Sequence, residues 1–165
     1  MYEQLSFMPA LNIDEKVNFK YVCKKYRLTL VQEKTFTYNQ KLQDVYSVVR
    51  FLKENIELQN EPEEVIVVLA VKTQLNVIGV FEVARGVINS CATSMREIFK
   101  RLIIANATSF IFAHNHPSGL STPSAEDIEF TRKLKEAGNL LGIRLLDSVI
   151  ISESSYYSFV EEQIL

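Results

Sequence analysis

The sequence is poor in two residue types that often define a small protein. Among its 165 residues there are two cysteines and two histidines. Cys23 and Cys91 lie far apart in the chain, and neither has a C-x-x-C partner. Cysteines of this kind behave as small apolar side chains. We therefore expect buried thiols at both positions.

Long apolar runs and an excess of positive charge are also missing. No apolar run approaches the ~20 residues of a membrane span, so no membrane partner is expected. The start, MYEQLSFMPALNIDEK, has no basic segment followed by an apolar one, which predicts no secretory signal and a cytoplasmic location. The net charge of −2 argues against an overall electrostatic grip on nucleic acid and leaves open only a local basic patch.

What the chain does contain fits one globular domain preceded by an arm. Hydrophobic residues make up 47% and charged residues 23%, as in ordinary soluble domains. Residues 1–39 are predicted to form an N-terminal arm. One or two strands are expected in it, because YRLTLVQEKTFTY tends to alternate between apolar and polar residues. Residues 40–165 are predicted to form the domain itself.

Within that domain the patterns predict both helices and strands. The apolar run VIVVLAV is typical of a strand covered on both faces, and a short polar turn joins it to a second, antiparallel strand. Apolar spacing predicts amphipathic helices elsewhere, Ser94 and Glu97 form a predicted capping box, and Gly142 is suited to end a helix. The expected elements are helices within 39–58, 95–106 and 128–141, strands at 65–71, 77–84, 109–113 and 143–152, and a covering tail at 155–165.

The most informative stretch is HNHPSGLSTPSAED, which contains both histidines of the chain. If SFIFA before it is a strand, alternation carries His114 and His116 out on the same side of the strand end. Pro123 suits a first helical turn, and Ser124 and Asp127 then share one helix face. Two imidazoles and one carboxylate with a fourth position left for water are typical of catalytic zinc. Taken singly, these residues would be surface histidines and a helix cap.

The spacing H-x-H-x7-S-x2-D resembles the JAMM signature of the JAB/MPN-domain metallopeptidases, and the longer run from REIFKRLII to DSVIIS is most similar to their RadC branch. The resemblance covers about residues 40–165. It implies an α/β fold, a mixed curved sheet flanked by helices in a three-layer, cytidine-deaminase-like arrangement. It also implies one Zn²⁺ per chain on His114, His116 and Asp127.

Glu82 interrupts the apolar pattern of the second predicted strand, and from the sequence alone it is either an exposed edge residue or held near a site. JAMM enzymes have a glutamate on an early strand as general base, so the resemblance implies that role for Glu82. Ser124 would stabilise the oxyanion. Two departures from RadC relatives stand out: Ser148 occupies a position where they usually have histidine, and the helix-hairpin-helix of longer relatives is not evident.

The expected function is zinc-dependent hydrolysis of a peptide or isopeptide bond by a metal-activated water. Two alternatives stay open: a DNA-repair-associated protein acting on nucleic acid, and a non-catalytic binding module of MPN type. The intact ligand set argues against the second alternative, and the net charge argues against the first. The sequence does not identify the peptide or protein substrate, and a homodimer stays open.

Overall fold

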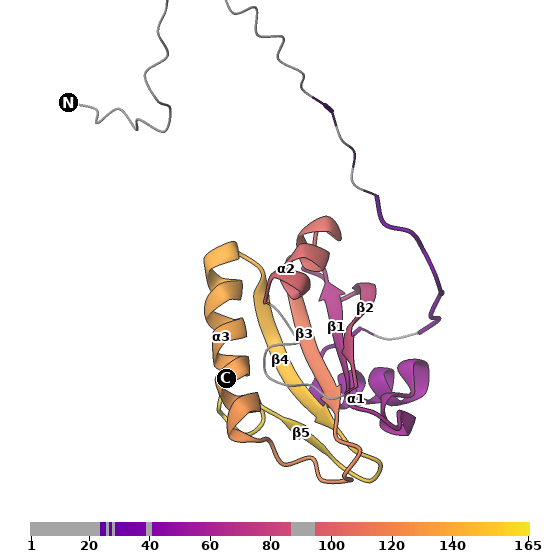
Figure 1. Ribbon diagram of the computed structural model, residues 1–165, viewed down its shortest axis with the longest axis vertical. Helices are drawn as coiled ribbons and strands as arrows, with labels where there is room; N and C mark the ends of the chain where they lie inside the picture. Colours follow the sequence, from indigo (N-terminus) through magenta and orange to yellow (C-terminus); the bar gives the residue numbers. More distant parts are fainter. Residues whose placement is uncertain (1–23, 26, 28, 39–40, 87–94) are drawn as a thin grey trace, which may run out of the picture.

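The structure is a computed structural model, which describes residues 24–25, 27, 29–38, 41–86 and 95–165. Cys23, Cys91 and Ser94 lie outside these residues, so the predictions made for them are untested. In the described part a five-stranded sheet has the order β2-β1-β3-β4-β5 (Figure 1). Its strands are β1 (Val65–Val71), β2 (Val77–Arg85), β3 (Ser109–Asn115), β4 (Arg144–Ile151) and β5 (Tyr156–Ser158).

The sheet is mixed, as predicted. β1 runs antiparallel to both β2 and β3, β4 is antiparallel to β5, and only β3 and β4 are parallel. All seven residues of β1 are buried, because β1 is an inner strand with apolar side chains on both faces. The sequence prediction of a doubly covered strand in an antiparallel hairpin is confirmed.

Helices cover both faces of the sheet. Residues of α1 (Val45–Phe51) and of the π-helix Leu52–Ile56 form one core with the side chains on one face of β1. The helices α2 (Met95–Ile104) and α3 (Ala125–Leu141) form a second core with the other face. This three-layer α/β arrangement confirms the predicted fold class, and Figure 1 shows α3 lying along β4. None of the helices in the described ranges is long and apolar enough to cross a membrane.

The N-terminal part departs from the predicted pattern. The helix expected within 39–58 starts only at Val45, after a capping box at Asp44, and a short 3-10 helix (Leu58–Asn60) ends the region. The described residues among 24–38 form no strand. Phe36 and Tyr38 instead pack their rings against Phe51 of α1, since alternation alone provides no neighbouring strand to pair with.

The crossover from β3 through α3 to β4 is what positions the candidate site. Gly142 ends α3 in the left-handed conformation, with a φ of 70°. Gly138 lies against the returning chain, where a Cβ atom would be 2.5 Å from the carbonyl oxygen of Ile143. Close packing of α3 on the start of β4 therefore depends on glycine here. The C-terminal tail was predicted as a cover, and it also supplies β5, which pairs with β4.

Candidate metal centre

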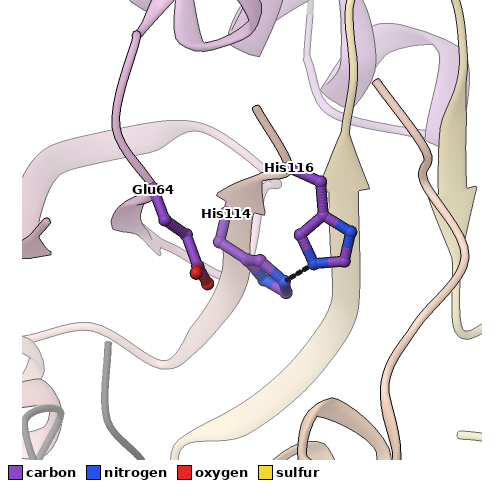
Figure 2. Close-up of side chains that lie close together, drawn as sticks. All are labelled: Glu64, His114 and His116. Carbon is purple, nitrogen blue, oxygen red and sulfur yellow. Dashed lines mark hydrogen bonds between the residues drawn. The ribbon is translucent and has the colours of Figure 1, made fainter. Parts of the chain in front are cut away.

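His114 and His116 lie at the end of β3 and point to the same side, as alternation predicts. Their Nε2 atoms are 3.1 Å apart (Figure 2). His114 is buried, with only 2% of its surface exposed. The backbone N–H of His116 donates to the carbonyl oxygen of Ile151 at the end of β4, so the neighbouring strand holds the chain where it leaves the sheet.

Asp127 reaches this pair from the first turn of α3. Its Oδ1 lies 3.3 Å from Nε2 of His114, and its Oδ2 lies 3.6 Å from Nε2 of His116. Ser124 caps the helix and holds the carboxylate. Its backbone N–H and its hydroxyl both donate to Oδ2 of Asp127, at 2.8 and 2.6 Å. The three residues predicted to bind metal are thus brought together.

The loop after β3 fixes the orientation of His116. Nδ1 of His116 is 2.8 Å from the carbonyl oxygen of Leu120. A carbonyl oxygen only accepts hydrogen bonds, so Nδ1 carries a proton, and Nε2 is the nitrogen that faces Asp127 and His114. Gly119 makes the turn possible, with a φ of 82° and its N–H bonded to the carbonyl oxygen of His116. Metal-binding histidines commonly hold their other ring nitrogen against a carbonyl oxygen in this way.

The electrostatics of the cluster favour a cation. Burial by itself would raise the pKa of the Asp127 carboxyl, but hydrogen bonds from His114 and His116 outweigh burial and hold that pKa well below its usual range. The hydrogen bond with Asp127 raises the pKa of His116 against the effect of partial burial, and the charge of Glu64 adds to this. The same negative charges would stabilise a metal ion in place of a proton.

The distances also fit a metal. Donor atoms about 2.0–2.2 Å from a tetrahedral zinc lie roughly 3.3–3.6 Å from one another. The two Nε2 atoms are 3.1 Å apart, Oδ1 of Asp127 is 3.3 Å from that of His114, and Oδ2 is 3.6 Å from that of His116. Three neutral or anionic ligands gathered around one point are therefore compatible with a zinc site.

A fourth group, which the sequence did not reveal, lies beside the histidines. Glu64 precedes β1, and its carboxylate and the ring nitrogens of His114 and His116 all lie within 4.8 Å of one another. Figure 2 shows the carboxylate pointing toward His114. Among the described residues the Glu64 carboxylate has no hydrogen bond or ion pair. The Glu64 carboxylate is therefore available to bind a metal ion or to accept a proton from a molecule bound in this centre.

Glu82, predicted from the resemblance as the general base, is not brought to the histidines. It lies opposite Val67 of β1, and Val67 packs in the core on the α1 side of the sheet. Directly opposed side chains share a face, whereas His114 follows Phe112 on the α2 and α3 side. The carboxylate of Glu82 instead accepts two hydrogen bonds from Arg85, both of 2.9 Å.

Two other predicted positions have clear surroundings. The hydroxyl hydrogen of Ser124 is donated to Asp127, so in this structure Ser124 orients a metal ligand, and its role toward an oxyanion stays a prediction. Ser148, where RadC relatives usually have histidine, is fully buried in β4 opposite Phe112 and accepts a hydrogen bond from Thr131 of α3 at 3.0 Å. Ser148 therefore links β4 to α3 in this protein.

The amino-acid sequence that forms this centre matches a known protein family. The RadC-like JAB domain matches residues 42–164. The chain belongs to the RadC-like JAB family. The match covers the sheet and all residues of the candidate metal centre, and it confirms the resemblance drawn from the motif.

This RadC-like JAB domain is also similar to curated proteins that share one name. The UPF0758 protein of Clostridium beijerinckii is 40% identical over 109 residues, which are 66% of this chain and 48% of that protein. The UPF0758 protein of Thermotoga maritima is 40% identical over 123 residues, or 74% of this chain and 54% of that protein. That of Histophilus somni is 36% identical over 155 residues, 94% of this chain and 68% of the relative. The chain spans about half the length of the first two relatives.

Proposed function

We propose that this RadC-like JAB domain is a zinc-dependent hydrolase that cleaves a peptide or isopeptide bond with a metal-activated water. One observation carries the proposal. The Nε2 atoms of His114 and His116 lie 3.1 Å apart, and the two oxygens of the Asp127 carboxylate lie 3.3 Å from the first and 3.6 Å from the second, next to the carboxylate of Glu64. Three protein ligands leave one position for a reacting molecule, as in catalytic rather than structural zinc sites.

The residues divide the work as follows. His114, His116 and Asp127 would hold the metal, and Ser124 and the carbonyl of Leu120 keep two of these ligands oriented. A bound zinc would lower the pKa of a water to about 7 and polarise the scissile carbonyl. Glu64 would accept the proton of the attacking water and return it to the leaving amine. We favour Glu64 over Glu82 for this role, because the carboxylate of Glu82 is engaged by Arg85 on the other face of the sheet.

The test begins with elemental analysis of the purified, untagged protein beside His116→Ala. We expect close to one zinc per chain, lost in the variant. Peptide and isopeptide substrates are then screened with the zinc-loaded protein, with chelated protein as the blank. Glu64→Gln and Glu82→Gln form a matched pair, the same chemical change at two carboxylates. Only Glu64→Gln should abolish hydrolysis while keeping zinc.

Other outcomes would redirect the proposal. A protein that takes up no zinc even when it is supplied would not be a hydrolase of this type. Zinc that binds without hydrolysis of any peptide-like substrate would favour a binding module in the same fold. Activity on nucleic acid is the weaker alternative, since two cations of α2, Lys100 and Arg101, are both bonded to Glu97.

A further inference from the structure

Asn115 lies between the two histidines, and its side chain is directed away from them. It is 1% exposed, and strand alternation sends it to the side opposite His114 and His116. A buried amide must have its hydrogen bonds satisfied. All of those described here go to one short segment of the chain, residues 61–65, at least 50 positions earlier.

Three hydrogen bonds make this connection. Oδ1 of Asn115 accepts from the backbone N–H of Val65 at 2.7 Å. Its Nδ2 donates to the carbonyl oxygens of Glu63 at 2.9 Å and Glu61 at 3.2 Å. The N–H of Val65 and the carbonyl of Glu63 flank Glu64 on either side. The backbone around Glu64 is therefore held by a side chain that belongs to the histidine motif itself.

A further contact, from the residue that follows β2, holds the same point. The carbonyl oxygen of Glu64 accepts from the N–H of Gly86 at 2.9 Å. The register explains where the side chain then points. Ile66 of β1 pairs with His114, and Glu64, two positions before Ile66, lies on the same face and within 4.8 Å of both histidines. The backbone of Glu64 is fixed while its carboxylate stays available to the metal centre.

Asparagine is the residue that this position requires. The side chain must accept from one N–H and donate to two carbonyl oxygens within one short reach. Aspartate of the same shape has no donor when ionised, and an aliphatic side chain has neither group. Glutamine carries the same amide on a longer stem, which would move it out of register with Val65.

We propose that Asn115 is a positioning residue, which holds the segment 61–65 so that the Glu64 carboxylate faces the metal centre. The motif HNH would then supply two metal ligands and, between them, the anchor of the general base. The catalytic consequence rests on the function proposed above, whereas the placement of Glu64 does not require hydrolysis and can be measured separately.

The decisive variant is Asn115→Asp, which keeps the volume and the acceptor for Val65 and removes both donated bonds. Misplacement of a catalytic group by about 1 Å costs roughly 10²-fold, so we expect kcat to fall about 100-fold with the zinc content unchanged. Because the loss acts through Glu64, adding Glu64→Gln should lower kcat little further. Asn115→Ala serves as a second variant, with all three bonds removed.

The control is Ser158→Ala, which removes a buried hydroxyl bonded to Asp147. Its effect on kcat should be small and independent of Glu64→Gln. Loss of zinc in Asn115→Asp would overturn the inference, because the residue would then support the histidines. An unchanged kcat in Asn115→Asp and Asn115→Ala would overturn it as well.

A measurement without substrate separates this inference from the proposed function. Amide hydrogen exchange of Gly86, whose N–H donates to the carbonyl of Glu64, should accelerate in Asn115→Asp and not in Ser158→Ala. With Co²⁺ as the probe metal, NMR relaxation of the Glu64 side chain should be strong in the unmodified protein and weaker in Asn115→Asp. Absence of hydrolysis or of metal in the unmodified protein would count against the proposed function. Unchanged Gly86 exchange in both Asn115 variants would count against the positioning role.

Discussion

The segment before β1 and the last residues of β2 lie at the same end of the sheet, and each contains a glutamate. Glu64 points to the face with the histidines, while Glu82 points to the other face and binds Arg85. Arg85 also binds Glu61, so the β2 side helps to hold the segment that carries Glu64. Two carboxylates of similar chemistry thus have different surroundings, because alternation along a strand decides which face of the sheet each one reaches.

The largest effect should come from the metal ligands. Asp127→Ala removes one of the three proposed donors, and zinc affinity should fall by more than the roughly 10–100-fold that is typical when a residue that only orients a ligand is lost. Isothermal titration with Zn²⁺ measures the change. Glu82→Ala is the control and should bind zinc as the unmodified protein does. Zinc affinity that survives Asp127→Ala would mean that Glu64 is itself a ligand.

The next largest effect should separate the two glutamates. Glu64→Gln should lower kcat by roughly 10²–10⁴-fold, the usual contribution of a general base, with zinc retained. Glu82→Gln should stay within about two-fold of the unmodified protein, since it removes exposed ion-pair contacts that contribute little. Steady-state kinetics on a peptide-like substrate found in the screen make the comparison. The reverse ranking would restore Glu82 as the base and reject Glu64.

A smaller effect on zinc affinity should come from Ser124. Ser124 orients the Asp127 carboxylate, much as Asn115 orients the segment that contains Glu64. Ser124→Ala removes the N-cap of α3 and the 2.6 Å hydrogen bond to Asp127. The free energy of unfolding should fall by about 1 kcal/mol, and zinc affinity by roughly ten-fold. Urea unfolding and zinc titration measure the two quantities. Ser124→Asp, which can cap without donating a hydroxyl, should recover the stability but not the affinity.

The smallest effect should come from Asp147, a second buried carboxylate. Burial raises the pKa of Asp147, although hydrogen bonds from Ser158, Val160 and Ser148 oppose this, whereas the pKa of Asp127 is lowered by its histidines. A raised pKa means that the folded state prefers the protonated acid. The resulting stability is present below the ordinary value of 3.8 and is lost as the pH rises through the folded-state pKa.

Asp147→Asn should remove this dependence. The difference in unfolding free energy between the unmodified protein and the variant should therefore decrease as the pH rises from below 3.8. Urea unfolding at several pH values gives this difference, from which the common contribution of Asp127 cancels. A difference that grows with pH instead would mean that Asp147 is ionised and stabilising in the folded protein.

Local patterns predicted much of the fold. The strand VIVVLAV, the hairpin after it and the α3 helix between Ser124 and Gly142 all follow from spacing and caps, and they are present. Predictions failed where a partner was needed. The alternating arm has no strand in its described residues, and the tail that was expected only as a cover forms β5 on β4. Strand formation depends on neighbours that a local pattern does not identify.

The candidate site divides in the same way. His114, His116, Ser124 and Asp127 lie within fourteen residues of one another, so strand alternation and one helical turn were enough to bring them together in the prediction. Glu64 had a weaker signal, an acidic pair just before a buried strand. Its place beside His116 needs the antiparallel pairing of β1 with β3, which spans about 50 positions of sequence. The sequence alone thus determined which candidate ligands come together, because short-range geometry is fixed by the backbone. Only the tertiary structure decided which glutamate faces it, because strand order and register are set by packing of the whole sheet.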